Sequence, residues 1–241
     1  MYRVQKILSM LGILSRRECE KNIVKGLVKV NDVVATLGTK VKIGDSITFD
    51  KTQYTVSSAM FNSKIEILVY HKPCGEIVTS KDDANRKTVF ERLPDTNGKW
   101  INIGRLDLET SGLLLFTNNG DIANKMMHPS SNISRKYEVM IKGSFDDIKK
   151  EQCVKGLDIG MSETGKFDSI STCKPVANKY TVTLKTGKNR EVRRVFRSVG
   201  CTVIKLKRIQ YDNIKLNNLL VSEYRYLTEK EIQSLSISFQ S

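Results

Sequence analysis

The spacing of apolar residues changes several times along the chain, and each change predicts an element. Residues 4–11 carry apolar side chains at helical spacing, and Gly12 ends that helix. Residues 15–18 (Ser-Arg-Arg-Glu) form a capping box that opens a second helix ending at Gly26. We expect this second helix to bury Cys19, Ile23 and Leu27. Short β-branched runs with two turns follow in residues 28–49, so two helices precede a small antiparallel sheet.

The polar segment 52–64 has no clear period and is predicted to be a linker between residues 1–51 and residues 65–241. Beyond it, strands and short helices alternate without a regular βαβ order. We therefore predict an α+β domain, with helices flanking a mixed, mostly antiparallel sheet. Strands are expected at 65–71, 100–103, 113–117, 135–141, 168–174, 179–185, 202–211, 214–216 and 224–227, and helices at 88–93, 121–127, 146–155, about 190–199 and after 228.

Two basic features stand out in this pattern. In the second helix, Arg17, Lys21 and Lys25 recur every four residues beside Arg16, which indicates either a phosphate-contacting ridge or a solvated face. The helix at 190–199 buries an apolar stripe of Val192, Val195, Phe196 and Val199. Its arginines at 190, 194 and 197 then point away from the core, whereas Arg193 lies at the edge of the stripe and can reach into a cleft.

One acidic loop lies between two of the apolar strands. Asp107 follows Arg105 in this loop, and burial of the carboxylate in a cleft would be offset by the arginine. An ordinary turn aspartate bonded to main-chain N–H groups is the alternative interpretation. Glu109, two residues later, is expected to face solvent.

Charge and composition narrow the possible functions. Forty Lys and Arg against 26 Asp and Glu give a formal charge of +14, which favours a polyanionic partner. Membrane phosphates are possible, but the basic residues spread over two folded regions, so nucleic acid is favoured. We expect no membrane insertion, because no apolar run has the length of a span. Five scattered cysteines indicate a reducing compartment, the cytoplasm.

The chemistry available to the chain is limited. It has two histidines, no cysteine pair at metal-ligand spacing, and no glycine loop of the kinds that bind nucleotide phosphates. We therefore expect neither a metal nor a cofactor. Catalysis, if present, depends on a carboxylate such as Asp107, which can serve as a nucleophile or a general base. Tyr137, at the start of an alternating strand, suits stacking on a base that has left its helix.

Several blocks of sequence resemble known families. SRRECEKNIVKGLVKVN, in its two-helix context, resembles the small RNA-binding domain named after ribosomal protein S4. The blocks HKPCGEIVT, GRLDLETSGLLLFTNNGD, HPSSNISRKYEV and TGKNREVRRVFRSVGCTVIKLKR follow in order. Together they resemble the ribosomal RNA pseudouridine synthases that carry the S4-type domain, nearest the bacterial large-subunit branch.

This resemblance implies a role for each matching residue. Asp107 would attack the target uridine, Tyr137 would stack on the uracil, and Arg193 would pair with the aspartate. Arg105 would help hold the flipped nucleotide, and Leu206 would pack near the base. For four further residues a phosphate contact and a solvated charge are both open: Lys72, Lys188, Arg190 and Arg208. Arg16, Arg17 and Lys21 would bind RNA from the first domain.

The expected function is isomerisation of a uridine in ribosomal RNA, free or in an assembly intermediate, by a monomer. A ribosome-assembly factor that binds rRNA without turnover is one alternative, and a base-excising glycosylase is another. The chain departs from the family pattern at Asn119, often Asp, and at Ser222, often Gly, and both changes concern turns.

Overall fold

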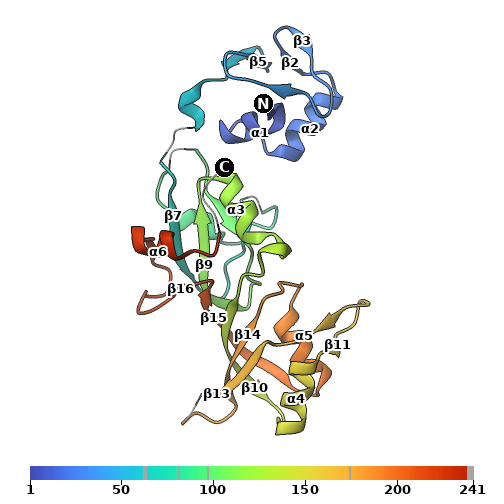
Figure 1. Ribbon diagram of the computed structural model, residues 1–241, viewed down its shortest axis with the longest axis vertical. Coiled ribbons are helices and arrows are strands. Elements are labelled where there is room, and N and C mark those ends of the chain that lie inside the picture. The colour runs from blue at the N-terminus through green and yellow to red at the C-terminus, as the bar shows by residue number, and fades with distance from the viewer. Residues whose placement is uncertain (62–63, 81, 97, 174, 238–241) are drawn as a thin grey trace. The chain divides into compact units, whose positions relative to one another are not determined.

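The computed structural model (Figure 1) describes residues 1–61, 64–80, 82–96, 98–173 and 175–237. The chain forms two compact units. Met1–Ile65 and Asp95–Trp100 make the first unit, and Glu66–Pro94 and Ile101–Ser241 make the second. The second unit is therefore not one continuous stretch from residue 65, as the sequence predicts, because the chain returns to the first unit at 95–100.

The first unit has the predicted order of two helices and a small sheet. Strands β2, β3, β5 and β6 form one antiparallel sheet in the order β3-β2-β5-β6, and β1 pairs with β4. Its elements are β1 (Tyr2–Arg3), α1 (Val4–Met10), α2 (Arg16–Val24), β2 (Val28–Val30), β3 (Val33–Val34), β4 (Lys40–Val41), β5 (Ser46–Phe49), β6 (Thr52–Thr55) and the 3₁₀ turn η1 (Ser58–Phe61).

The start of helix α2 confirms the predicted capping box, in which Ser15 Oγ accepts from the Glu18 N–H and the Glu18 carboxylate accepts from the Ser15 N–H. Its end corrects one prediction. The helix stops at Val24, and Gly26 adopts a φ of 71°. Leu27 thus lies beyond the helix and is exposed, not buried.

The segment predicted to be a linker is largely folded. Strand β6 occupies Thr52–Thr55 and pairs with β5, and Val56, which follows it, is fully buried. The polar composition misled the prediction because β6 is an edge strand, which can leave polar side chains in solvent. Residues 62–63 of the predicted linker lie outside the described residues.

The second unit is built on a mixed, mostly antiparallel sheet, as predicted. The strand order is β13-β14-β10-β15-β9-β7-β17, with β16 beside β15 and β8 beside β9. The strands are β7 (Ile67–Lys72), β8 (Ile101–Ile103), β9 (Thr110–Thr117), β10 (Arg135–Lys142), β11 (Leu157–Asp158), β12 (Thr164–Gly165), β13 (Ser169–Thr172), β14 (Lys179–Leu184), β15 (Thr202–Tyr211), β16 (Ile214–Lys215) and β17 (Tyr224–Tyr226).

Helices flank this sheet at both ends of its strand order. Figure 1 shows α4 and α5 with β10, β13 and β14, and α3 and α6 near β7 and β9. The helical elements are η2 (Val89–Arg92), α3 (Gly120–Met127), η3 (Pro129–Ser131), α4 (Asp147–Lys155), α5 (Glu191–Ser198) and α6 (Glu229–Ser234). No helix in the described ranges is long and apolar enough to cross a membrane.

The apolar residues whose spacing predicted β10 and α5 are buried in the structure. Tyr137, Val139 and Ile141 of β10 are buried on one face, and the apolar stripe of α5 is buried as expected. Asn119 accepts from the N–H groups of Asp121 and Ile122, so asparagine caps α3. The hairpin β11–β12 was not predicted, and residue 174, expected in a strand, lies outside the described residues.

Strand β15 joins the two halves of the sheet. It pairs antiparallel with β10 and parallel with β9, where Arg208 lies opposite Gly112. A Cβ at Gly112 would lie 2.2 Å from the Arg208 carbonyl oxygen, and Gly112 has a φ of 106°. Only glycine allows strands β9 and β15 to approach this closely.

Candidate active site

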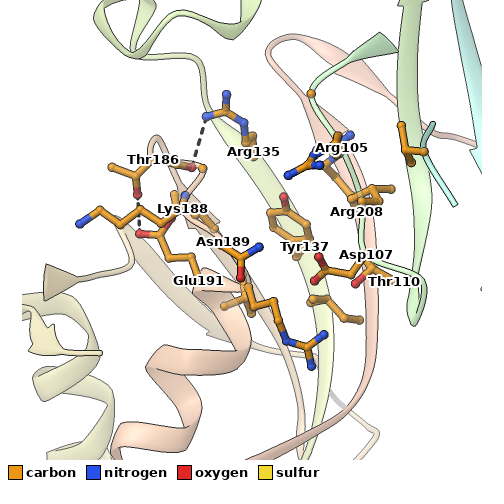
Figure 2. Close-up of a pocket in the computed structure, with 18 of the residues that line it drawn as sticks. Arg105, Asp107, Thr110, Arg135, Tyr137, Thr186, Lys188, Asn189, Glu191 and Arg208 are labelled. Carbon is orange, nitrogen blue, oxygen red and sulfur yellow. Dashed lines mark hydrogen bonds between the residues drawn. The ribbon is translucent and has the colours of Figure 1, made fainter. Parts of the chain in front are cut away.

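A cavity of about 990 Å³ opens in the second unit. That volume lies in the range of small-molecule and cofactor sites. Its lining includes seven residues that the sequence predicted for the site, namely Arg105, Asp107, Tyr137, Lys188, Arg190, Leu206 and Arg208. Lys72 and Arg193 do not line the cavity. Figure 2 shows the Tyr137 ring in the cavity, with Arg105 and Asp107 on one side and Asn189 on the other.

Residues 104–109, here called the acidic loop, carry Asp107 and lead directly into β9. Two main-chain bonds hold this loop, one from the turn that follows β7 and one from the first residue of β9. The Gly75 N–H donates to the Leu108 carbonyl (2.8 Å), and the Thr110 N–H donates to the Asp107 carbonyl (3.0 Å). The Asp107 carboxylate is half-buried and forms no ion pair with Arg105 in the part of the chain that the structure describes.

Lys72, the last residue of β7, lies beneath this loop. Its side chain is fully buried, and Nζ donates to the carbonyls of Pro73 (2.9 Å), Asp107 (3.2 Å) and Thr110 (3.0 Å). Burial lowers the pKa of Lys72, although nearby negative groups, Asp107 among them, oppose this. Lys72 is thus neither a solvated charge nor a phosphate contact, because its ammonium is engaged in holding the loop main chain.

Sheet register brings the floor of the cavity together. Tyr137 of β10 lies opposite Arg208 of β15, and Leu206 lies opposite Thr110 of β9. Paired residues share a face of a sheet, so these side chains gather on one side. Tyr137 and Leu206 are mostly buried, and both line the cavity beside Asp107.

Arg208 is an unusual component of this floor because its guanidinium is almost fully buried. Nε donates to the Leu113 carbonyl (2.7 Å), and the group lies 5.1 Å from the ring centre of Tyr211. A register shift leaves Ile209 without a partner in β10, which brings Tyr211 to the face of Arg208. Among the residues that the structure describes, the Nη2 atom of Arg208 and Oγ1 of Thr110 find no hydrogen-bond partner. The solvated-charge interpretation of Arg208 is therefore wrong.

Residues 185–190, here called the basic loop, form the opposite wall. Arg135 Nη1 donates to the carbonyls of Lys185 (2.6 Å) and Thr186 (3.3 Å). The buried Glu191 carboxylate accepts from Thr186 Oγ1 (2.6 Å) and from the Lys188 N–H (3.0 Å). Figure 2 shows two of these bonds as dashed lines. Sequence reasoning missed Arg135, although it lies two positions before Tyr137 on the same alternating strand.

Two predicted residues belong to the basic loop. Lys188 Nζ donates to the Thr164 carbonyl (2.5 Å), so it ties this loop to the β11–β12 hairpin. Arg190 precedes α5 with φ 49° and ψ 30°, a left-handed conformation, and its side chain is 48% exposed. Asn189 also lines the cavity and was not singled out from the sequence, although it lies within the GKNR block.

Arg193 contacts the acidic loop at a different residue from the one expected. Nη2 donates to the Glu109 carbonyl (3.0 Å) and Nη1 to the Val203 carbonyl (3.2 Å). No ion pair links Arg193 to Asp107 among the described residues. The nearest carboxylate recorded for Arg193 is that of Glu109, 4.0 Å from Nη1. Glu109 is exposed, as expected, but it faces Arg193 and Arg190.

Arg194 was predicted to point away from the core, and its guanidinium is bound to the β11–β12 hairpin. Nε donates to the Ile159 carbonyl (2.9 Å) and Nη2 to the Gly160 carbonyl (2.6 Å), and Nη1 pairs with Glu163 (2.5 Å). The guanidinium therefore fastens the β11–β12 hairpin to α5. Local periodicity could not reveal this contact because the hairpin itself was not predicted.

The basic ridge lies in the first unit. Arg16, Arg17 and Lys21 are exposed on α2, as the helical spacing predicts. Arg16 also borders a hollow of about 290 Å³ with Tyr2, Arg3 and Lys6. Within the described ranges, no three His, Cys, Asp or Glu side chains gather as metal ligands would.

Comparison with known proteins agrees with this geometry. The model of the family described as RNA pseudouridylate synthase matches residues 66–198, and the S4 domain model matches residues 3–47. A crystal structure of a pseudouridylate synthase aligns with a TM-score of 0.67 over 97% of this chain and 99% of that one. Its sequence identity is 23%, so this likeness concerns the fold alone.

Curated relatives are more similar in sequence. Ribosomal large subunit pseudouridine synthase B of Xylella fastidiosa is 40% identical over 97% of this chain, and the match spans 50% of that protein. The namesake from Pseudomonas aeruginosa is 39% identical over 97% of this chain and 61% of its own length. The Vibrio vulnificus protein of the same name is 39% identical over 90% and 69%. This chain thus spans about half to two thirds of these relatives.

The family model covers more than half of the chain, and the residues it matches include Asp107, Tyr137 and the basic loop. Sequence, fold and cavity lead to one assignment. The chain belongs to the RNA pseudouridylate synthase family.

Proposed function

We propose that this chain converts a uridine of large-subunit ribosomal RNA to pseudouridine. The observation that carries the proposal is the single cavity that brings Asp107, Tyr137 and Leu206 together between two loops. The names of the relatives supply the substrate class. With a volume of about 990 Å³, the cavity has room for a flipped nucleotide and part of its backbone.

Asp107 is the proposed nucleophile. Its carboxylate forms a bond to ribose C1′ as the bond between C1′ and uracil N1 breaks, and the base turns within the cavity. C5 of the base then bonds to C1′ and displaces the carboxylate, which is regenerated, while C5 loses a proton and N1 gains one. No electrons are exchanged with another reactant, so the reaction needs no redox partner.

The remaining residues hold the nucleotide and the loop. Tyr137 stacks on the uracil, Leu206 packs against its edge, and Arg105 holds the flipped nucleotide near Asp107. Lys72 and Arg193 are positioning residues, since both donate to carbonyls of the acidic loop or the residue after it. The ridge of Arg16, Arg17 and Lys21 contributes phosphate contacts from the S4 domain.

The test is replacement of Asp107. Asp107→Asn should abolish tritium release from rRNA labelled at uridine C5, while RNA affinity stays within about tenfold, or about 1.4 kcal/mol. The matched control is Asp147→Asn, which changes an exposed aspartate of α4 paired with Lys150 and should leave turnover intact.

Mapping rRNA from cells with and without the gene identifies the modified uridine. The wild-type gene should restore the missing pseudouridine, and Asp107→Asn should not. Turnover by Asp107→Asn at the wild-type rate would exclude this mechanism. Binding of rRNA by the wild type without any pseudouridine would indicate an assembly factor instead.

A further inference from the structure

The Glu109 carboxylate faces two arginines, Arg190, which lines the cavity, and Arg193, which does not. Its Oε2 lies 3.8 Å from Arg190 Nη2 and 4.0 Å from Arg193 Nη1. Both distances exceed those of charge-assisted hydrogen bonds, about 2.7–2.9 Å. The Glu109 side chain is 66% exposed, so water competes for it. The Glu109 carboxylate therefore lies near the guanidinium groups of Arg190 and Arg193 without a short hydrogen bond to either.

The Arg190 main chain adopts a strained conformation where its side chain faces Glu109. Its φ of 49° and ψ of 30° fall in the left-handed region, which disfavours any residue with a Cβ. Such conformations persist where surrounding contacts impose them, and they gather at ligand sites. Here the Glu191 carboxylate fixes the loop from the other side, and Arg190 lines the cavity.

The carboxylate of Glu109 can leave without releasing the acidic loop. The Glu109 main-chain carbonyl is held separately by Arg193 Nη2 at 3.0 Å and by Cys74 Sγ at 3.5 Å. Arg193 is itself only 11% exposed and is also bonded to the Val203 carbonyl. The main chain therefore keeps its position whatever anion faces the two arginines.

We propose that Arg190 and Arg193 form a binding subsite for an RNA phosphate beside the target uridine, and that Glu109 occupies this subsite until RNA displaces it. The inference rests on the proposed function for the identity of its ligand. A phosphate can approach a guanidinium with two short bonds, which the Glu109 carboxylate does not make. An RNA without a phosphate at this position does not displace Glu109 and is repelled by its negative charge. The competition between Glu109 and phosphate therefore favours correctly placed RNA.

A double-mutant cycle tests the subsite, with binding of a large-subunit rRNA transcript at about 50 mM salt as the measurement. Glu109→Gln removes the competing anion and should tighten binding about fivefold, whereas Arg190→Gln should weaken it about fivefold. In the Arg190→Gln background, Glu109→Gln should gain less than about twofold. The matched control is Glu151→Gln, an exposed glutamate paired with Lys155 on α4, which should change binding by less than about twofold.

Two outcomes overturn the proposal. One is a full gain from Glu109→Gln in the Arg190→Gln background, which would mark a general charge effect. The other is no gain from Glu109→Gln in the wild type. The cycle measures binding and not catalysis. If the variants bind rRNA as expected but the wild type forms no pseudouridine, the proposed function is disproved and the phosphate subsite is still supported.

A second variant separates binding from folding. Arg190→Gly relieves the left-handed backbone and should raise the melting temperature while weakening RNA binding at least as much as Arg190→Gln. Met161→Gly is the matched control, since Met161 is an exposed residue with a φ of 57° in the β11–β12 hairpin. It should raise the melting temperature without changing RNA binding. Wild-type binding by Arg190→Gly would contradict the proposal.

Discussion

The two loops that face each other across the cavity differ in how deeply the cations that bind their carbonyls are buried. The acidic loop is fixed from inside the protein by Lys72, which is fully buried and donates to three carbonyls. The basic loop is held by the buried Glu191 carboxylate at Thr186 and Lys188, and its carbonyls at Lys185 and Thr186 are bound near the surface by Arg135 through exposed bonds. Water can replace the exposed bonds of Arg135 more easily than those of Lys72, whose side chain is fully buried.

This difference suits the parts that the two loops are proposed to play. A nucleophile must be placed within a fraction of an ångström, and buried bonds with no alternative partner provide that precision. A loop that contacts RNA gains from bonds that can rearrange at small cost. The comparison predicts that the acidic loop controls the rate of the chemical step and that the basic loop controls affinity.

The largest effect is expected from Lys72→Met. This change leaves three carbonyls of the loop and its neighbours without their donor and should lower the unfolding free energy by about 2–4 kcal/mol. The resulting shift of Asp107 should reduce turnover about 100-fold. Urea unfolding and tritium release measure the two effects. Lys142→Met, at the exposed end of β10, is the control, and equal behaviour of the two variants would refute the role of Lys72.

A smaller effect is expected from Arg135→Gln. The basic loop loses its surface bonds, so the unfolding free energy should fall by about 1 kcal/mol, and KM for RNA should rise about tenfold with little change in kcat. Steady-state kinetics measure the split between kcat and KM, with the exposed Arg197→Gln of α5 as control. If kcat fell as in Lys72→Met, the two loops would not have different roles.

The smallest effect concerns pH. His71 of β7 is buried, and its Nδ1 lies 2.7 Å from the Leu219 carbonyl oxygen. Burial lowers the pKa of His71, and the charge of Lys207 adds to this, while the Leu219 carbonyl opposes it. Below about pH 6.5 the unfolded chain takes up a proton that the folded chain resists. The unfolding free energy should therefore decrease by at most about 1.4 kcal/mol per pH unit.

The measurement is urea unfolding at several pH values between 7.5 and 5, on the wild type and on His71→Asn. The asparagine amide can still donate to the Leu219 carbonyl but does not titrate. The difference between the two proteins should shrink as the pH falls. A difference that is constant over this range would show that His71 does not cause the acid sensitivity.

Local patterns were sufficient for much of the fold. The capping box at Ser15, the buried stripe of α5 and the alternation of β10 all depend on neighbours within a few residues, and all three were predicted. Strand β6 was not predicted, because its stability comes from main-chain pairing with β5, and such pairing leaves no apolar period in the sequence.

The positions and contacts of the long charged side chains could not be predicted from the sequence. Lys72 ends an apolar strand and looks like a surface charge until β7 pairs with β9, where Lys72 lies opposite Gly112. Arg208 lies opposite the same glycine from the other side. The sequence therefore located the acidic and basic loops, but only tertiary pairing separates the residues that hold the site from those proposed to bind RNA.

The central position of β15 has a consequence for the order in which the protein is made. Asp107 precedes β9 and Tyr137 lies on β10, and in the sheet these two strands meet only through β15. A chain synthesised as far as Gly200 holds both residues on strands that are not yet joined. The cavity can thus form only after Thr202–Tyr211 has left the ribosome and inserted between strands made earlier, a long-range step that is slow compared with hairpin formation.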